Sequence, residues 1–173
     1  MAGIYLHIPF CKQACYYCDF HFSTQTDHTR ELVESMAGEI MLQRDYLGGE
    51  IIQSVYFGGG TPSILTVREL QMLLETIRNF FEVVTEAEIT LEANPDDLSI
   101  DKLVAFKEIG FNRLSIGIQS FQNDVLKFLN RAHDSAMASQ SVVVARHAEF
   151  GNISIDLIYA IPGQTNHEWK ENI

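Results

Sequence analysis

The sequence predicts an α/β fold, arranged as a partial TIM-like (βα) barrel of parallel strands. Short apolar runs alternate with longer segments of helical periodicity along the whole chain. Strands and helices that alternate in this way form right-handed βαβ units and a parallel sheet. The chain has 173 residues, fewer than the roughly 250 that a closed eight-fold barrel needs. The barrel is therefore expected to be partial. A length of 173 residues suits one domain, which we expect over residues 1–173.

Five strands are expected where runs rich in Ile, Val, Leu or Tyr occur, several of them with period-two alternation. These runs cover residues 3–8, 52–57, 88–93, 113–118 and 152–159. Each run is short enough for a strand and is separated from the next by a segment long enough for a crossover helix.

Helices are expected between the strands, because apolar residues recur there with a spacing that places them on one face. The first face comprises Leu32, Val33, Met36, Ile40 and Leu47. The second comprises Val67, Leu70, Leu73, Leu74, Ile77 and Phe81. A third helix is expected over residues 100–109, and a fourth region over 123–150 is expected to break near 130–135.

Helix boundary signals agree with this assignment. Thr66 and Glu69 have the spacing of a capping box. Gly48, Gly110 and Gly151 stand where a glycine would end a helix.

A second capping box near the end of the chain bears on its completeness. It is formed by Thr165 and Glu168, and the chain ends about two turns later. A partial barrel and a fragment of a longer protein both fit this pattern. We favour the fragment, truncated after the fifth strand.

The charge balance excludes some partners. With 12 Lys and Arg against 23 Asp and Glu, the net charge is −11, which disfavours non-specific binding to nucleic acid or anionic lipid. No apolar run approaches the ~20 residues of a membrane span. The N-terminus has no basic stretch followed by an apolar one, so we expect no secretory signal and a cytoplasmic location.

The three cysteines are the most informative residues. Cys11, Cys15 and Cys18 are the only cysteines, and their C-x3-C-x2-C spacing in one loop makes a poor disulfide framework. Three thiolates on a four-iron cluster leave one iron open to a small molecule. The alternative is structural zinc, with His21 as fourth ligand. We favour the iron–sulfur cluster, because structural zinc sites usually combine two well-separated pairs of ligands.

Several polar or small residues follow the expected strands. Glycines 58–60 and Thr61 suit a loop whose backbone approaches a ligand, although a plain turn would look the same. Alternation places Glu92, Gln119 and Asp156 on the barrel's interior face, opposite their apolar neighbours. A solvated rim would explain each one singly, whereas the three together indicate a site.

These residues belong to segments in which the chain resembles the radical S-adenosylmethionine superfamily. The segments cover nearly the whole chain in family order: 5–11 with Cys15 and Cys18, 56–62, 92–95, 112–121, 129–133 and 156–164. Within the superfamily the chain looks most like the branch of oxygen-independent coproporphyrinogen III oxidases and related heme chaperones. Asn130 and Ala160 stand where that branch usually has glycine.

The resemblance implies a radical S-adenosylmethionine topology and a set of cofactors. These are a [4Fe–4S] cluster on the three cysteines, one or two molecules of S-adenosylmethionine, and heme. Residues expected to contact the S-adenosylmethionine on the open iron are Tyr5, Gly59 and Glu92. Residues that match a second S-adenosylmethionine site are Tyr17, Gly60, Thr61, Gln119, Arg131 and Asp156. The implied chemistry is reductive cleavage of S-adenosylmethionine to a radical that abstracts a substrate hydrogen.

Two functions follow from this resemblance. One is a heme chaperone that delivers heme to an acceptor protein; the other is an oxidase of coproporphyrinogen III. Both imply an electron donor such as flavodoxin or ferredoxin. The oxidases usually carry a further cysteine where this chain has Phe20, and a longer segment before the strand that begins here at Gly3. Both differences favour the chaperone, and a structural zinc-binding domain is the remote alternative.

Overall fold

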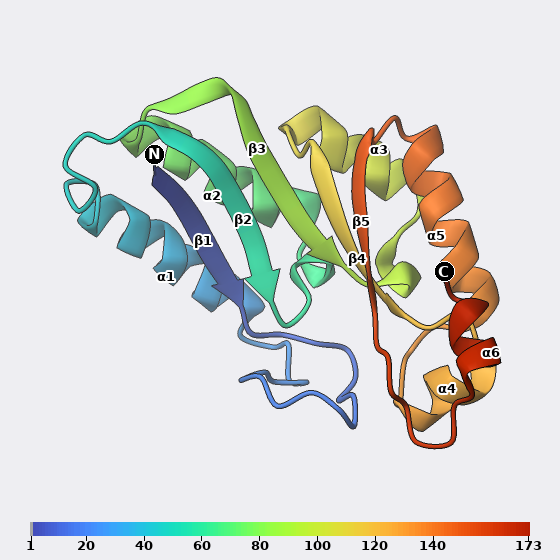
Figure 1. Cartoon of the computed structure of the whole chain (residues 1–173). Helices are drawn as coiled ribbons and strands as arrows, with labels where there is room; N and C mark the ends of the chain where they lie inside the picture. Colours follow the sequence, from blue (N-terminus) through green and yellow to red (C-terminus); the bar gives the residue numbers. More distant parts are fainter. Residues whose placement is uncertain (1) are drawn as a thin grey trace.

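The computed structural model describes residues 2–173 and contains one five-stranded parallel sheet in sequential order (Figure 1). The strands are β1 (Ala2–Ile8), β2 (Ile52–Gly59), β3 (Val83–Ala93), β4 (Arg113–Gln119) and β5 (Asn152–Leu157). The predicted fold class and all five strands are confirmed. β3 begins five residues before the expected 88, because Val83 pairs with Ile52 across a register shift.

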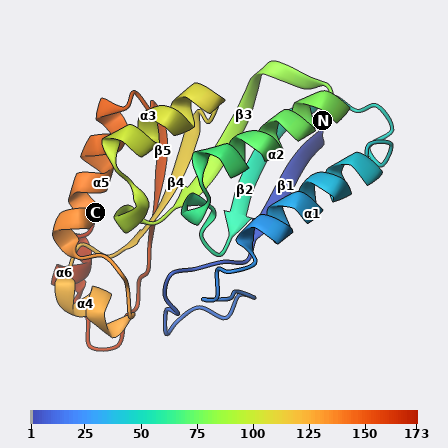
Figure 2. The ribbon, with the colours of Figure 1, turned by 180° about the vertical axis from the view of Figure 1, so that it is seen from behind.

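The helices are α1 (Thr29–Leu42), α2 (Val67–Phe80), α3 (Ile100–Ile109), α4 (Asn123–Phe128), α5 (Ser135–His147) and α6 (Asn166–Lys170). Because the strand order is sequential, every right-handed crossover moves in the same direction, which places the crossover helices on one face of the sheet. Figure 2 shows α1, α2 and α3 side by side over that face. The sheet is therefore an arc of a barrel, with helices on its outside.

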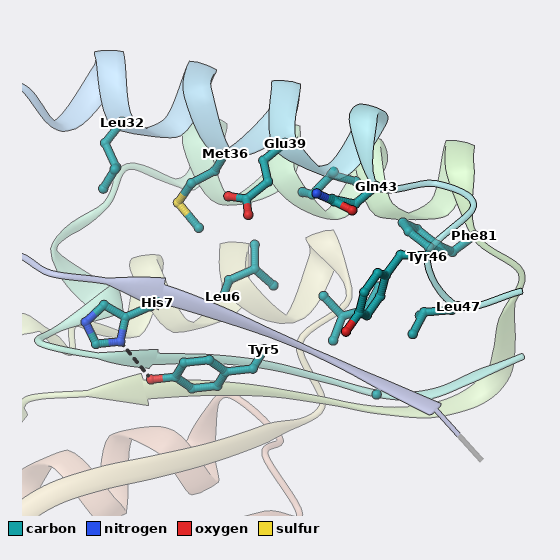
Figure 3. Close-up of a pocket in the computed structure, with 13 residues that line it drawn as sticks. Tyr5, Leu6, His7, Leu32, Met36, Glu39, Gln43, Tyr46, Leu47 and Phe81 are labelled. Atoms are coloured by element: carbon teal, nitrogen blue, oxygen red, sulfur yellow. Dashed lines mark hydrogen bonds between the residues drawn. The ribbon is translucent and has the colours of Figure 1, made fainter. Parts of the chain in front are cut away.

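The two faces of the sheet differ in chemistry. The helix-covered face carries buried apolar side chains, including Leu6, Phe57, Leu91 and Ile116. Alternate residues point to the other, concave face, where Tyr5, Tyr56, Glu92, Ser115 and Asp156 lie. Figure 3 shows this alternation on β1: Leu6 points to α1, and Tyr5 points away from it. The predicted interior placement of the polar residues agrees with this geometry.

The predicted helix boundaries are only partly right. The capping boxes at Thr66 and Thr165 are both formed, and Gly110 ends α3 in the left-handed conformation with φ 114°. The expectations for Gly48 and Gly151 are wrong.

Different residues end those two helices. α1 stops at Leu42, so Leu47 lies outside it, and Gly48 belongs to the following turn. α5 ends at His147, and Glu149 supplies the left-handed residue that follows it, with φ 63°.

The break between α4 and α5 occurs where it was expected. Asn130, within that break, has φ 56°, a conformation that asparagine tolerates better than most residues. Ala160 has φ 59° and bears a strain of about 1–2 kcal/mol there, because a Cβ is disfavoured in this region. Both positions therefore keep the left-handed backbone that glycine would favour. None of the helices within residues 2–173 is long and apolar enough to cross a membrane.

Candidate functional site

A cavity of about 200 Å³ lies where the carboxyl ends of the strands meet the cysteine loop. Ligands of parallel sheets bind at this edge. Eleven of the twelve predicted site residues line the cavity: Cys11, Cys15, Tyr17, Cys18, Gly59, Gly60, Thr61, Glu92, Gln119, Arg131 and Asp156. The structure thus brings together residues that lie up to 145 positions apart in the chain.

The cysteine loop begins directly after β1 and is anchored by backbone hydrogen bonds. The N–H of Gly60 donates to the carbonyl of Ile8 at 2.8 Å, and that of Thr61 donates to Phe10 at 2.7 Å. Further along, the N–H of Tyr16 donates to the carbonyl of Leu129 at 3.1 Å. The loop is therefore attached both to the end of β2 and to the end of α4.

An ion-pair network also holds the loop. Lys12, between the first two cysteines, contacts the carboxylates of Asp96 and Asp97 in the turn after β3, with 2.9 Å to Asp96 Oδ2. The side chain of Asp97 is almost fully buried and accepts a hydrogen bond from Ser63 Oγ at 2.7 Å. Removing Lys12 would take away the cation in contact with this buried carboxylate.

The glycines after β2 are required for close approach. A Cβ on Gly60 would lie 2.7 Å from the carbonyl oxygen of Phe10 and 3.0 Å from Cys11 Sγ. Gly59 has φ 112°, and a Cβ there would meet the ring of His7 at 2.8 Å. The backbone therefore passes against His7 at Gly59 and against the cysteine loop at Gly60, and neither position has room for a side chain.

Two of the three thiols receive hydrogen bonds from the cavity wall. Thr61 Oγ1 donates to Cys11 Sγ at 3.4 Å, and Arg131 Nη1 donates to Cys15 Sγ at 3.4 Å. Burial raises the pKa of the Cys11 thiol, and the Thr61 hydrogen bond opposes this rise. Sulfur atoms with such donors are suited to carry negative charge.

Cys11, Cys15 and Cys18 all line the cavity and could supply the three thiolates of an iron–sulfur cluster. No group of three or more His, Cys, Asp or Glu side chains within residues 2–173 converges on one ion site. A four-iron cluster distributes its thiolates over separate irons, so the three sulfurs need not converge on a single point. His21, the expected fourth zinc ligand, is exposed and does not line the cavity.

Glu92 presents an oriented carboxylate to the cavity. Its Oε1 accepts a hydrogen bond from Tyr56 Oη at 2.6 Å, and its Oε2 accepts one from the N–H of Gly59 at 3.2 Å. Burial raises the pKa of Glu92, whereas these two hydrogen bonds lower it. Burial and the bond to Glu92 raise the pKa of Tyr56 to about 12, so the phenol stays a donor. This carboxylate can accept hydrogen bonds from the hydroxyls of a ligand.

Tyr5 is the one predicted site residue that does not line this cavity. Its ring stacks on Tyr56 with centroids 5.9 Å apart, and its hydroxyl lies 3.1 Å from His7 Nδ1 (Figure 3). It lines a different cavity of about 620 Å³ between β1 and α1. Its connection to the cysteine site is through Tyr56, which in turn contacts Glu92.

Arg131 lies across the cavity from Glu92 and has several partners. Its Nη2 donates to Asn94 Oδ1 at 2.7 Å and to the carbonyl of Gly117 at 2.6 Å, and its Nη1 lies 3.2 Å from Tyr17 Oη. Its buried Nε has no partner among residues 2–173. A guanidinium that lines the cavity and contacts Cys15 Sγ fits a site that takes an anionic group.

Gln119 and Asp156 close the remaining side of the cavity. Gln119 is buried, has φ 67°, and accepts a hydrogen bond from the N–H of Ile158 at 3.0 Å. Asp156 is exposed at the end of β5.

Sequence reasoning missed several residues of the site. They are Gln13, Phe20, Phe22, Tyr56, Ala93, Asn94, Ser115 and Gly117; Tyr56 contacts Glu92, and the others line the cavity. Tyr56 and Ser115 were detectable, because alternation places each on the same face as its predicted neighbours on β2 and β4. No local signal in the sequence shows that Asn94 joins Thr61 to Arg131.

The site residues all lie within a match to a known protein family. The family model described as the radical SAM superfamily matches residues 5–173. The heme chaperone HemW of Bacillus subtilis is 38% identical over 175 residues, which cover all of this chain and 46% of that protein. The oxygen-independent coproporphyrinogen III oxidase of Synechocystis is 34% identical, covering 99% of this chain and 37% of that protein.

Solved structures give the same picture. The coproporphyrinogen III oxidase HemN from Escherichia coli superposes with a TM-score of 0.89 at 31% identity, covering 98% of this chain and 40% of that one. Elp3 from Methanocaldococcus infernus has a TM-score of 0.63 at 14% identity and supports the fold alone. The chain spans less than half the length of these relatives.

Proposed function

The chain belongs to the radical SAM superfamily, and on that basis we propose that Cys11, Cys15 and Cys18 hold a [4Fe–4S] cluster with one open iron that binds S-adenosylmethionine. We further propose that the protein acts on tetrapyrroles. The observation that carries the first proposal is the meeting of all three thiols with the glycine backbone of β2 and the carboxylate of Glu92 in one cavity. Three thiolates and one open iron suit a ligand that brings its own donor atoms.

In this proposal the residues that line the cavity bind different parts of the ligand. The backbone of Gly59 and the carboxylate of Glu92 lie next to each other and would hold polar groups of the S-adenosylmethionine on the open iron. Arg131 lines the cavity and would hold a carboxylate. When bound, the cluster and S-adenosylmethionine supply reductive carbon–sulfur cleavage, and the protein positions them and excludes water.

The remaining predicted residues are divided between the S-adenosylmethionine site on the open iron and a second S-adenosylmethionine site. Tyr5 supports the S-adenosylmethionine site from behind Tyr56. The second S-adenosylmethionine site would use residues on the Arg131 side of the cavity: Tyr17, Gly60, Thr61, Gln119 and Asp156.

We favour a heme chaperone over an oxidase. The relatives named heme chaperone and those named oxidase have similar identities, so identity does not separate the two. Phe20 supports the chaperone, because it stands where the oxidases usually carry a further cysteine. Its side chain is 73% exposed beside the cysteines. The partners in this proposal are heme, an acceptor protein and an electron donor such as flavodoxin or ferredoxin.

The cluster is tested by substituting Cys15→Ala in anaerobically purified protein. We expect the loss of brown colour and of most of the bound iron, because a three-thiolate site would be reduced to two ligands. Ala14→Ser, an exposed change in the same loop, is the matched control and should retain the iron. Full iron retention in Cys15→Ala would refute the cluster assignment.

The choice between the two functions is tested on the reconstituted full-length protein, because the present chain spans less than half the length of the relatives named oxidase. Heme titration followed by absorbance should show saturable binding. Incubation of the same sample with coproporphyrinogen III, S-adenosylmethionine and a reductant should release no carbon dioxide. Turnover of coproporphyrinogen III without heme binding would reverse this choice and favour the oxidase.

A further inference from the structure

We propose that Asn94 is a positioning residue that directs two hydrogen-bond donors onto the cysteine sulfurs and thereby sets the reduction potential of the cluster. The donors are Thr61 and Arg131, and the sulfurs are those of Cys11 and Cys15. The inference rests on the proposed function, since it requires these cysteines to hold a cluster.

The side-chain amide of Asn94 joins the two donors. Its Nδ2 lies 3.2 Å from Thr61 Oγ1, and its Oδ1 lies 2.7 Å from Arg131 Nη2. The same two residues reach the sulfurs at 3.4 Å each, Thr61 to Cys11 and Arg131 to Cys15. A continuous chain of hydrogen bonds therefore runs from one cysteine to the other through a single amide.

The direction of every bond in this chain is determined by chemistry. A guanidinium can only donate, so the atom of Asn94 that faces Arg131 must be the carbonyl oxygen. The NH₂ group then faces Thr61 and donates to its hydroxyl oxygen. Since a hydroxyl has one proton and Thr61 Oγ1 accepts from Asn94, that proton is free to point at Cys11 Sγ.

The backbone fixes Asn94 in this position. It stands between the end of β3 and the turn Pro95–Asp97, and its N–H donates to Ser63 Oγ at 3.3 Å. Thr61 is 3% exposed, so its hydroxyl has little access to water as an alternative partner. Hydrogen bonds to cluster sulfurs are among the factors that set reduction potentials, because they stabilise the more negative, reduced state.

The substitution Asn94→Asp tests the proposal with almost no change in shape. The carboxylate has no proton to donate, so the Thr61 hydroxyl would turn to it and leave Cys11. The added negative charge acts in the same direction. We expect roughly a tenfold lower ratio of reduced to oxidised cluster at a fixed electrode potential. For a one-electron couple this corresponds to a reduction potential about 59 mV more negative than in the wild type.

Two variants at Thr61 separate the hydrogen bond from the charge. Thr61→Val keeps the shape, adds no charge and removes the donor, so it should also shift the potential to more negative values. Thr61→Ser keeps the hydroxyl and should retain the wild-type potential. In the Thr61→Val background, Asn94→Asp should have a smaller effect than in the wild type, because only the charge contribution remains.

The measurement is a spectroelectrochemical titration of the reconstituted proteins, with iron content determined in parallel. Wild-type potentials in both Asn94→Asp and Thr61→Val would overturn the inference and leave the cluster assignment intact. If Asn94→Asp takes up no cluster, Thr61→Val decides alone, and an unchanged potential there overturns the inference. Absence of a cluster from the wild type would instead refute the proposed function.

Discussion

At the scale of single residues, the contact between Tyr56 and Glu92 shows what the sequence could and could not predict. Glu92 was predictable, because strand alternation and position at a strand end place it in the site. Its partner was not, because Tyr56 lies 36 residues earlier, and only the parallel register of β2 and β3 brings the two together.

The substitution Tyr56→Phe should weaken S-adenosylmethionine binding by about 2- to 10-fold at neutral pH, the effect of losing one hydrogen bond worth ~0.5–1.5 kcal/mol. Tyr56 donates to the charged carboxylate and so lowers the pKa of Glu92, against the effect of burial. Without it the pKa of Glu92 rises further. As the pH is lowered, S-adenosylmethionine binding should therefore be lost at a higher pH in Tyr56→Phe than in the wild type. Calorimetric titration of the reconstituted proteins would measure this difference.

Tyr46→Phe is the matched control, because this tyrosine is 80% exposed and lines the cavity beside α1. It should leave both affinity and pH profile unchanged. Identical pH profiles for Tyr56→Phe and wild type would show that Tyr56 does not act through Glu92.

Gly60→Ala should prevent full loading of the cluster. The new Cβ would lie 2.7 Å from a backbone oxygen of the cysteine loop, which can move only by displacing Cys11. We expect at least a twofold loss of iron per chain after anaerobic reconstitution. In Gly38→Ala, the control within α1, the Cβ meets nothing within 4 Å. This variant should keep its iron and gain roughly 0.5–1 kcal/mol of unfolding free energy. Equal iron in both variants would contradict the account.

At the scale of elements, the cysteine loop depends on its attachment to the turn after β3. Lys12→Met should lower the free energy of unfolding by about 1–3 kcal/mol, because it removes the cation in contact with the buried carboxylate of Asp97, which then keeps the Ser63 hydrogen bond and the charge of Lys102. Chemical denaturation of the apo protein measures this loss.

Arg30→Met is the control for Lys12→Met. It removes the exposed pair between Arg30 and Glu34 on α1, which solvent screens and which contributes little to stability. If both variants lose the same small amount, the contact of Lys12 with Asp97 does not hold the loop.

Element types were predictable, whereas several element ends were not. Period-two and helical patterns reflect which face is buried, and the burial of Leu70, Leu73 and Ile77 on α2 follows the predicted face. Where a helix ends depends on which nearby residue adopts the left-handed conformation, and the positions of the glycines alone do not determine this. α5 ends at His147, and Glu149 adopts the left-handed conformation after it, although Gly151 follows shortly after.

At the scale of the whole molecule, the arrangement of the sheet determines where the site lies. Sequential parallel strands place the helices outside and collect the polar side chains on the concave face, with the cysteine loop across its end (Figure 1). This architecture followed from the order of strands and helices, whereas the predicted cavity lining also needed the cysteine spacing and, for Tyr17 and Arg131, the family resemblance. The link from Asn94 to Thr61 and Arg131 did not, because it joins three loops whose spacing is known only once the sheet is formed.

The central claim is most directly tested by the electron paramagnetic resonance spectrum of the reduced, anaerobically reconstituted protein with and without S-adenosylmethionine. We predict a [4Fe–4S] signal that changes when S-adenosylmethionine is added, because the ligand would bind the iron that lacks a cysteine. A signal unaffected by S-adenosylmethionine, or a protein that contains zinc and no iron, would contradict it.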